Sequence, residues 1–201
     1  MSKKKKRYAA RFPRRTSGIR AQETRAGLAQ TWWGRRWIAA VDALQLGARL
    51  GRARAYAASG QVVSIAFQGN RVVASVIGVR PDPYEVVLDF RAPTGAARSR
   101  IVAALRAEPM LVARLLADDL PLEVSEIFAA EGCGLFPGGR LDADAAPRLY
   151  DVVMSCTCPD WANPCKHVAA VLLLVGEEIA RRPYRLVELR GISLEELVDE
   201  G

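Results

Sequence analysis

Three cysteines and the only histidine of the chain lie within twelve consecutive residues. Cys156 and Cys158 form a C-x-C pair, and Cys165 and His167 form a C-x-H pair that begins seven residues after Cys158. Three thiolates and one imidazole are enough donors for the closed tetrahedral shell of a structural zinc ion, with no position left for water. The sequence therefore predicts one structural Zn²⁺, bound by Cys156, Cys158, Cys165 and His167.

Two other states are open to these cysteines, buried thiols and disulfides. Disulfides are typical of oxidising compartments, and nothing in this sequence indicates export. A C-x-C pair also has poor geometry for a mutual bridge. Neither state explains why the sole histidine joins the cluster. Cys133 lies between two glycines, far from the cluster in sequence, and is expected to be an ordinary thiol.

The spacing resembles the SWIM zinc finger, whose pattern is C-x-C, a variable gap, and C-x-H. The segments Cys158–Trp161 and Pro164–Val171 are similar to the form found in bacterial SWIM proteins. Further landmarks extend the resemblance over roughly residues 28 to 200: Trp32-Trp33-Gly34 with Trp37, Arg52 to Gly60, Pro83-Tyr84, Leu135-Phe136-Pro137 and Leu189-Arg190-Gly191. The resemblance implies a module that binds DNA or protein, and bacterial relatives are often associated with SWI/SNF-type helicases.

Two elements must position the donors. Residues 149–154 are β-branched and apolar, which predicts a strand with Cys156 and Cys158 in the turn at its end. Residues 164–180 have apolar side chains at helical spacing, which predicts a helix. Residues two apart on a regular helix point about 200° apart, so Cys165 and His167 must lie at its first turn. Free amide groups and the positive end of the helix dipole favour thiolates there.

The remaining elements follow from periodicity and turn signals. Residues 30–44 read as an amphipathic helix whose stripe of Trp33, Trp37, Val41 and Leu44 favours core packing over a base-stacking platform. The other expected helices are 48–58, 99–107, 109–118, 121–131, 183–189 and 193–198, and the expected strands are 61–68, 71–78 and 84–90. Gly69-Asn70 predicts a hairpin turn between the first two strands, and Ser193 with Glu196 fits a capping box.

The expected fold class is α+β, with a small antiparallel sheet with helices, a helical middle and a C-terminal SWIM-type zinc finger. The expected domain organisation has four parts: a basic, disordered tail (1–25), an α+β domain with a three-stranded meander (26–131), a linker rich in glycine and proline (132–147), and the finger with the C-terminal helices (148–201).

The net charge of +7 is concentrated at one end of the chain. Residues 1–25 hold ten basic residues and one acidic residue, a net charge of +9, whereas the remainder holds 19 basic and 21 acidic residues, a net charge of −2. Such a tail favours contact with nucleic-acid phosphates without sequence preference, or else it is a solubilising end. The candidate contact residues are Lys3, Lys4, Lys5, Lys6, Arg7, Arg11, Arg14 and Arg15.

The chemistry argues against an enzyme. The one histidine is used as a metal ligand, and the sequence contains neither a P-loop nor a dinucleotide-binding motif. We expect no small-molecule substrate, no membrane contact, and a cytoplasmic protein that could associate with the nucleoid. The expected function is a non-enzymatic zinc-binding module for DNA and/or protein interaction, acting with a SWI/SNF-type helicase. The alternative is a protein-only adaptor with a structural finger and an incidental tail.

Overall fold

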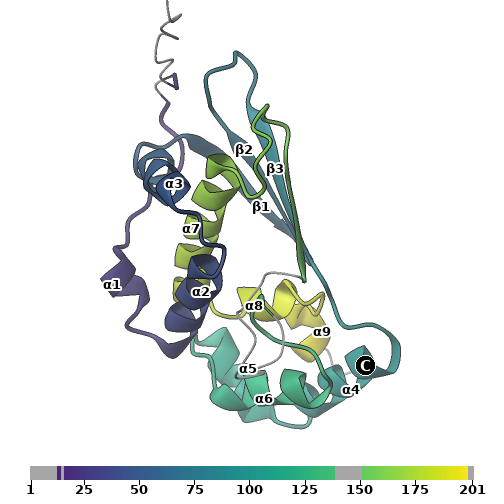
Figure 1. The fold of residues 1–201 in the computed structure, drawn as a ribbon. Helices are drawn as coiled ribbons and strands as arrows, with labels where there is room; N and C mark the ends of the chain where they lie inside the picture. Colours follow the sequence, from purple (N-terminus) through teal and green to yellow (C-terminus); the bar gives the residue numbers. More distant parts are fainter. Residues whose placement is uncertain (1–12, 15, 139–150, 199–201) are drawn as a thin grey trace, which may run out of the picture.

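The computed structural model describes residues 13–138 and 151–198, with the exception of Arg15. In chain order its elements are α1 (Arg25–Leu28), α2 (Trp32–Asp42), α3 (Ala48–Ala58), β1 (Val62–Gln68), β2 (Arg71–Val76), β3 (Tyr84–Phe90), α4 (Gly95–Arg106), α5 (Pro109–Leu116), α6 (Leu122–Ala130), β4 (Val152–Cys156), α7 (Lys166–Arg181), α8 (Arg185–Glu188) and α9 (Leu194–Val198). Helices α2, α3 and α7 lie together beside the sheet, and α4, α5, α6 and α9 gather beyond one end of it (Figure 1). The α+β class is confirmed.

The sheet is antiparallel, with the strand order β1-β2-β3-β4. Gln68 pairs with Arg71 across the predicted two-residue turn, where Gly69 has φ +59. The sequence predicted a meander of three strands apart from the finger. Instead β4, the strand that leads into the finger, pairs with β3 over Val86–Phe90. A local pattern cannot reveal this pairing, because the two strands are far apart in the chain.

Helix α7 is the centre of the core. Eleven of its sixteen residues are buried, which is the pattern of a helix enclosed on most sides. The indole Nε1 of Trp37 donates to the carbonyl of Leu172 at 3.1 Å. Gly176 makes this approach possible, because a Cβ at that position would lie 2.6 Å from Cδ1 of Trp37.

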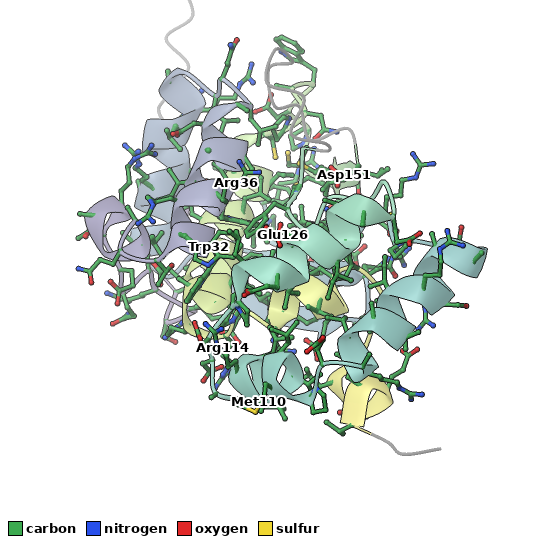
Figure 2. All side chains as sticks on the ribbon, turned by 90° about the horizontal axis from the view of Figure 1, so that it is seen from below. Trp32, Arg36, Met110, Arg114, Glu126 and Asp151 are labelled. Atoms are coloured by element: carbon green, nitrogen blue, oxygen red, sulfur yellow. The ribbon has the colours of Figure 1, made fainter. Side chains whose placement is uncertain are left out.

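The tryptophans of α2 belong to the interior. Trp33 and Trp37 are buried, as their helical stripe predicted. Trp32 is half-buried: its ring meets Phe136 edge-on at 5.5 Å, and its Nε1 donates to Leu120 O at 2.9 Å. The Arg36 guanidinium lies 5.9 Å from the centre of the Phe136 ring. Figure 2 shows Trp32 and Arg36 on the side of α2 that faces α6.

The predicted disorder of residues 1–25 needs correction for the part that the structure describes. The backbone N–H groups of Gly18, Ile19 and Ala21 donate to Gly60, Val62 and Ala57, at 3.1, 2.7 and 3.0 Å. Helix α1, which the sequence did not predict, begins at Arg25. These contacts attach the segment to β1 and α3. Residues 1–12 lie outside the described residues.

The predicted linker also differs in its described part, residues 132–138. Leu135 and Phe136 are buried there, so this stretch belongs to the core and is no solvated connection. Residues 139–147 lie outside the described residues. The Ser193 cap is confirmed, since its Oγ accepts from the backbone N–H of Glu196 at 3.1 Å. No described helix is long and apolar enough to cross a membrane.

Candidate metal centre

The end of β4 and the start of α7 bring the four predicted ligands together. Cys156 is the last residue of β4, not a turn residue as predicted, and Cys158 follows in the loop. Cys165 is the N-cap of α7, with extended backbone angles, and His167 lies in the first turn. The predicted position of the second pair at the start of the helix is confirmed. The cap residue is not yet helical, so a C-x-H pair can point at one centre.

The distances fit a zinc ion. One donor atom from each of the four residues lies within 4.8 Å of the others. The Sγ atoms of Cys156 and Cys165 are 3.8 and 3.7 Å from Nδ1 of His167. Donors bound to tetrahedral zinc at about 2.0–2.3 Å are about 3.5–3.8 Å apart. The cluster therefore has both the donor types and the dimensions of a zinc site.

Two tyrosines hold the imidazole of His167. The ring is 2% exposed and lies between Tyr56, at 5.1 Å, and Tyr84, at 4.7 Å between ring centres. Nδ1 faces the thiols, whereas the buried Nε2 has no hydrogen-bond partner among the described residues. With Nδ1 as the metal ligand, the ring proton lies on Nε2. In this site, aromatic packing orients the ring.

The thiols differ in acidity. The hydrogen bond from Cys156 lowers the pKa of Cys165 to about 3, and the bond to His167 adds to this effect. The same bond, together with burial, raises the pKa of Cys156, and burial raises the pKa of Cys158. Zinc binds cysteine as the thiolate, so metal binding at this cluster releases protons from its thiols.

The loop between Cys158 and Cys165 presents Trp161, whose residue exposure is 92%. The loop is fixed to the sheet, because Nδ2 of Asn163 donates to Met154 O at 2.7 Å. At its other end, Thr157 N donates to Glu85 O at 3.0 Å. In the sequence, Trp161 is part of the segment that resembles SWIM proteins, and no contact role was predicted for it. The sequence did contain a signal for a contact residue: Trp161 is a large apolar residue in a short loop that is otherwise rich in polar residues and proline.

The other candidate residues lie apart from this centre. Cys133 is not among the clustered donors. Of the predicted nucleic-acid contacts, only Arg14 falls within the described residues, and its Nη2 donates to the carbonyl of Pro81. Lys3, Lys4, Lys5, Lys6, Arg7, Arg11 and Arg15 lie outside the described residues. Contact of this set with nucleic acid stays a prediction.

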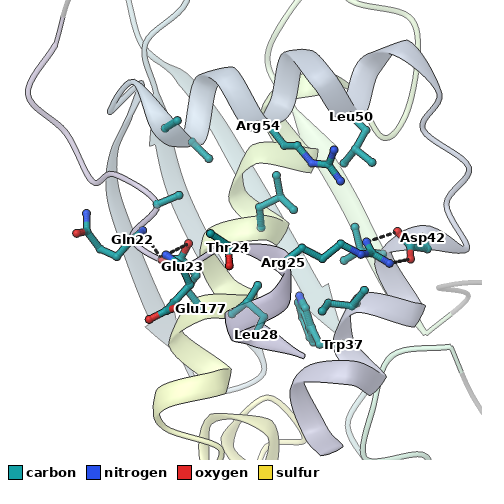
Figure 3. Close-up of a pocket in the computed structure, with 16 residues that line it drawn as sticks. Gln22, Glu23, Thr24, Arg25, Leu28, Trp37, Asp42, Leu50, Arg54 and Glu177 are labelled. Atoms are coloured by element: carbon teal, nitrogen blue, oxygen red, sulfur yellow. Dashed lines mark hydrogen bonds and ion pairs between the residues drawn. The ribbon is translucent and has the colours of Figure 1, made fainter. Parts of the chain in front are cut away.

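A mainly apolar cavity of about 390 Å³ lies between α1, α2, α3 and α7 (Figure 3). The carboxylate of Glu177 accepts the backbone N–H groups of Gln22 and Glu23, at 3.0 and 3.1 Å. Arg25 and Asp42 form an ion pair along the cavity. The Glu177 contacts connect the N-terminal segment to α7, and the ion pair connects it to α2.

Comparison with known proteins agrees with this geometry. Residues 152–176 match the SWIM zinc finger family. The uncharacterized protein Rv2102 of Mycobacterium tuberculosis is 35% identical over 181 residues, which are 90% of this chain and 62% of that protein. The chain thus spans less than two thirds of the length of that relative, and no solved structure matches it. The match falls on the strand, loop and helix that assemble the four donors, so the chain carries a SWIM zinc finger, as its sequence predicted.

Proposed function

We propose that the chain is a non-enzymatic interaction module in which a structural zinc ion holds a loop that binds a partner protein. The observation that carries this proposal is Trp161, exposed on a loop whose two ends are fixed by Cys158 and Cys165. Tryptophan is enriched among residues that dominate binding energy at protein interfaces. A fixed loop also loses little conformational entropy when a partner binds.

The donor set supports a structural role for zinc. Four protein donors fill a tetrahedral shell, so the metal offers no open position for a substrate. The ion would tie the end of β4 to the first turn of α7, the helix at the centre of the core. The only histidine of the chain is one of the donors, which leaves none to act as a general base.

The local charge favours protein over phosphate at this loop. Zinc with three thiolates and a neutral imidazole has a formal charge of −1, and Asp160 adds another negative charge beside Trp161. Lys166 is the one cation within the finger motif, and its Nζ lies 5.7 Å from the centre of the Tyr56 ring. The SWI/SNF-type helicase implied by the SWIM resemblance is the first partner class to test.

DNA is the second candidate, and the observation that favours it is the charge of +9 on residues 1–25. Lysine and arginine contacts to phosphates release counterions, so affinity should fall with salt at a log–log slope of about −0.9 per phosphate. Residues 16–25 are attached to the body, so the arm to delete is residues 1–12. If that deletion leaves duplex affinity and slope unchanged, the tail is incidental and the protein-only adaptor remains.

The test compares three purified proteins: wild type, Trp161→Ala and Met110→Ala. Met110 is a matched control, since it is also an exposed apolar side chain but lies on α5, in the helical part beyond the sheet (Figure 2). Proteins that co-purify from the native host are themselves purified and titrated against all three. We expect Trp161→Ala to keep its zinc and lose the partner, and Met110→Ala to keep both. A partner that binds Trp161→Ala as tightly as wild type would exclude the loop as the contact.

A further inference from the structure

Strand β1 has an open edge. It pairs with β2 over Ser64–Gln68, and no other described segment pairs with that stretch. In an antiparallel ladder, alternate residues direct their N–H and C=O groups away from the partner strand. Protected edges usually carry charged side chains or proline. The residues of β1, VVSIAFQ, include neither.

A groove runs between this edge and α7. Its volume is about 300 Å³, and its apolar lining comes from Ile65 and Phe67 on β1 and from Leu174 and Val175 on α7. Ile65 and Phe67 are half-buried, whereas Ala66 between them is exposed. Side chains alternate between the two faces of a strand, so a strand added beside β1 would place every second side chain in the groove.

The chain itself already uses the first position of this edge. Ile19 forms an antiparallel bridge with Val62, and its N–H donates to Val62 O at 2.7 Å. Ile19 also lines the groove. The segment then turns away, since Ala21 N donates to Ala57 O on α3. The edge thus accepts an extended backbone at its start and is left open from Ser64 onward.

The charges around the groove favour an acidic occupant. Arg20, Arg181 and Arg185 line the groove, against Glu177 and Glu178. Glu178 is engaged by Arg182 at 2.9 Å and lies 3.9 Å from Arg181, and both oxygens of Glu177 accept backbone N–H groups. Arg185 lies 4.8 Å from the centre of the Phe67 ring. Arg20 has no acidic partner among the described residues.

We propose that the β1 edge, Ser64–Gln68, and the adjoining groove bind an extended peptide segment of a partner protein. Its backbone pairs with β1, alternate apolar side chains enter the groove, and an acidic residue faces Arg20 and Arg181. An extended polypeptide matches the row of alternating donors and acceptors on an open strand edge, and the side-chain pockets add specificity. This site goes beyond the finger loop, because β1 and β4 are opposite edges of the sheet.

The probe is a display library of random twelve-residue peptides, selected on the full chain. Enriched peptides are synthesised with a fluorescent label and titrated by anisotropy. We expect alternating apolar residues with an acidic neighbour. N-methylation of one alternate set of peptide amides should weaken binding at least tenfold, and methylation of the other set should not. If the two sets have equal effects, or if no peptide is enriched, strand addition at β1 is excluded.

Two variants place the same charge on opposite faces of β1. Ile65→Lys should weaken the enriched peptides at least tenfold, whereas Ala66→Lys should not. If Ile65→Lys loses its zinc or its cooperative melting, Arg181→Glu takes its place. Trp161→Ala should bind the peptides normally, which separates this site from the finger loop. Equal binding to wild type and the groove variants, or binding only after removal of residues 1–12, would overturn the proposal.

Discussion

The two edge strands of the sheet differ in how they are secured. At the β4 edge, Cys156 joins the metal cluster, and Asp151, just before the strand, pairs with the buried Arg190. At the β1 edge, the single bridge from Ile19 is the only backbone pairing that the described residues add. Helix α7 contributes to both edges: candidate metal ligands at its start lie near β4, and residues further along line the groove beside β1. We infer that stability is concentrated at the β4 edge, while the β1 edge keeps its pairing capacity.

Removal of the metal should have the largest effect, because it takes away the main support of the β4 edge. Structural zinc contributes roughly 10–16 kcal/mol in small fingers. Cys165→Ala removes a ligand and the N-cap residue of α7. We expect it to lose zinc and to be cleaved by protease first within residues 152–165, while the helices and strands of residues 28–130 survive. Metal analysis and the masses of the fragments measure both effects.

Cys133→Ser is the matched control for that experiment, because it removes a thiol that lies outside the cluster. It should keep one zinc per chain and the wild-type cleavage pattern. Equal cleavage rates for Cys165→Ala and wild type would contradict the structural role of zinc. Loss of zinc from Cys133→Ser would contradict the ligand set.

The ion pair that precedes β4 should give the next largest effect. Arg190 is 2% exposed, and its Nη2 lies 2.6 Å from Oδ2 of Asp151. Asp151→Ala leaves that guanidinium buried without its carboxylate, which costs about 3–5 kcal/mol. Asp89 on β3 pairs with Arg71 at the surface, so Asp89→Ala should cost less than about 1 kcal/mol. Denaturant midpoints at a common m-value give the loss of stability in each variant. Similar losses for Asp151→Ala and Asp89→Ala would contradict a larger role for the buried ion pair.

The clustering of the four donor residues was predictable because all the information for it is local. Cys156 to His167 span twelve residues, and the C-x-H spacing itself requires the start of a helix. The hairpin turn at Gly69-Asn70 and the tryptophan stripe of α2 were predictable for the same reason, since their signals lie within a few residues. These are the features in which backbone preference and side-chain spacing agree.

Long-range contacts could not be predicted in this way. Three contacts join segments that are far apart in sequence. They are the pairing of β4 with β3, the hydrogen bond from the buried Arg190 to Leu135 O, and the hydrogen bonds from residues 22 and 23 to Glu177. The basic composition of residues 1–25 indicated disorder, whereas Gly18 and Ile19 find backbone acceptors on the body. A composition signal averages over a segment and cannot show a few specific hydrogen bonds.

The contact between α7 and α2 should show an intermediate effect. Gly176→Ala places a Cβ 2.6 Å from the ring of Trp37, and overpacking of this kind costs about 1–3 kcal/mol. Gly51 on α3 has open space around its Cβ position, so Gly51→Ala should instead stabilise the protein by up to about 1 kcal/mol. Thermal melting of the two zinc-loaded variants should therefore show shifts of opposite sign. A lower melting temperature for both would contradict this account of the packing.

The smallest change in stability is expected for Val153→Ala on β4. Its comparison with Val152→Ala tests the register in which β4 pairs with β3. Val152 is 5% exposed and pairs with Phe90, whereas Val153 is 72% exposed and pairs with Asp89. Val152→Ala should cost about 2 kcal/mol, and Val153→Ala should stay within about 0.5 kcal/mol of wild type. A slip of one residue would exchange the two faces, so the order of the costs would reverse. Chemical denaturation of the zinc-loaded proteins therefore distinguishes the observed pairing from its nearest alternative.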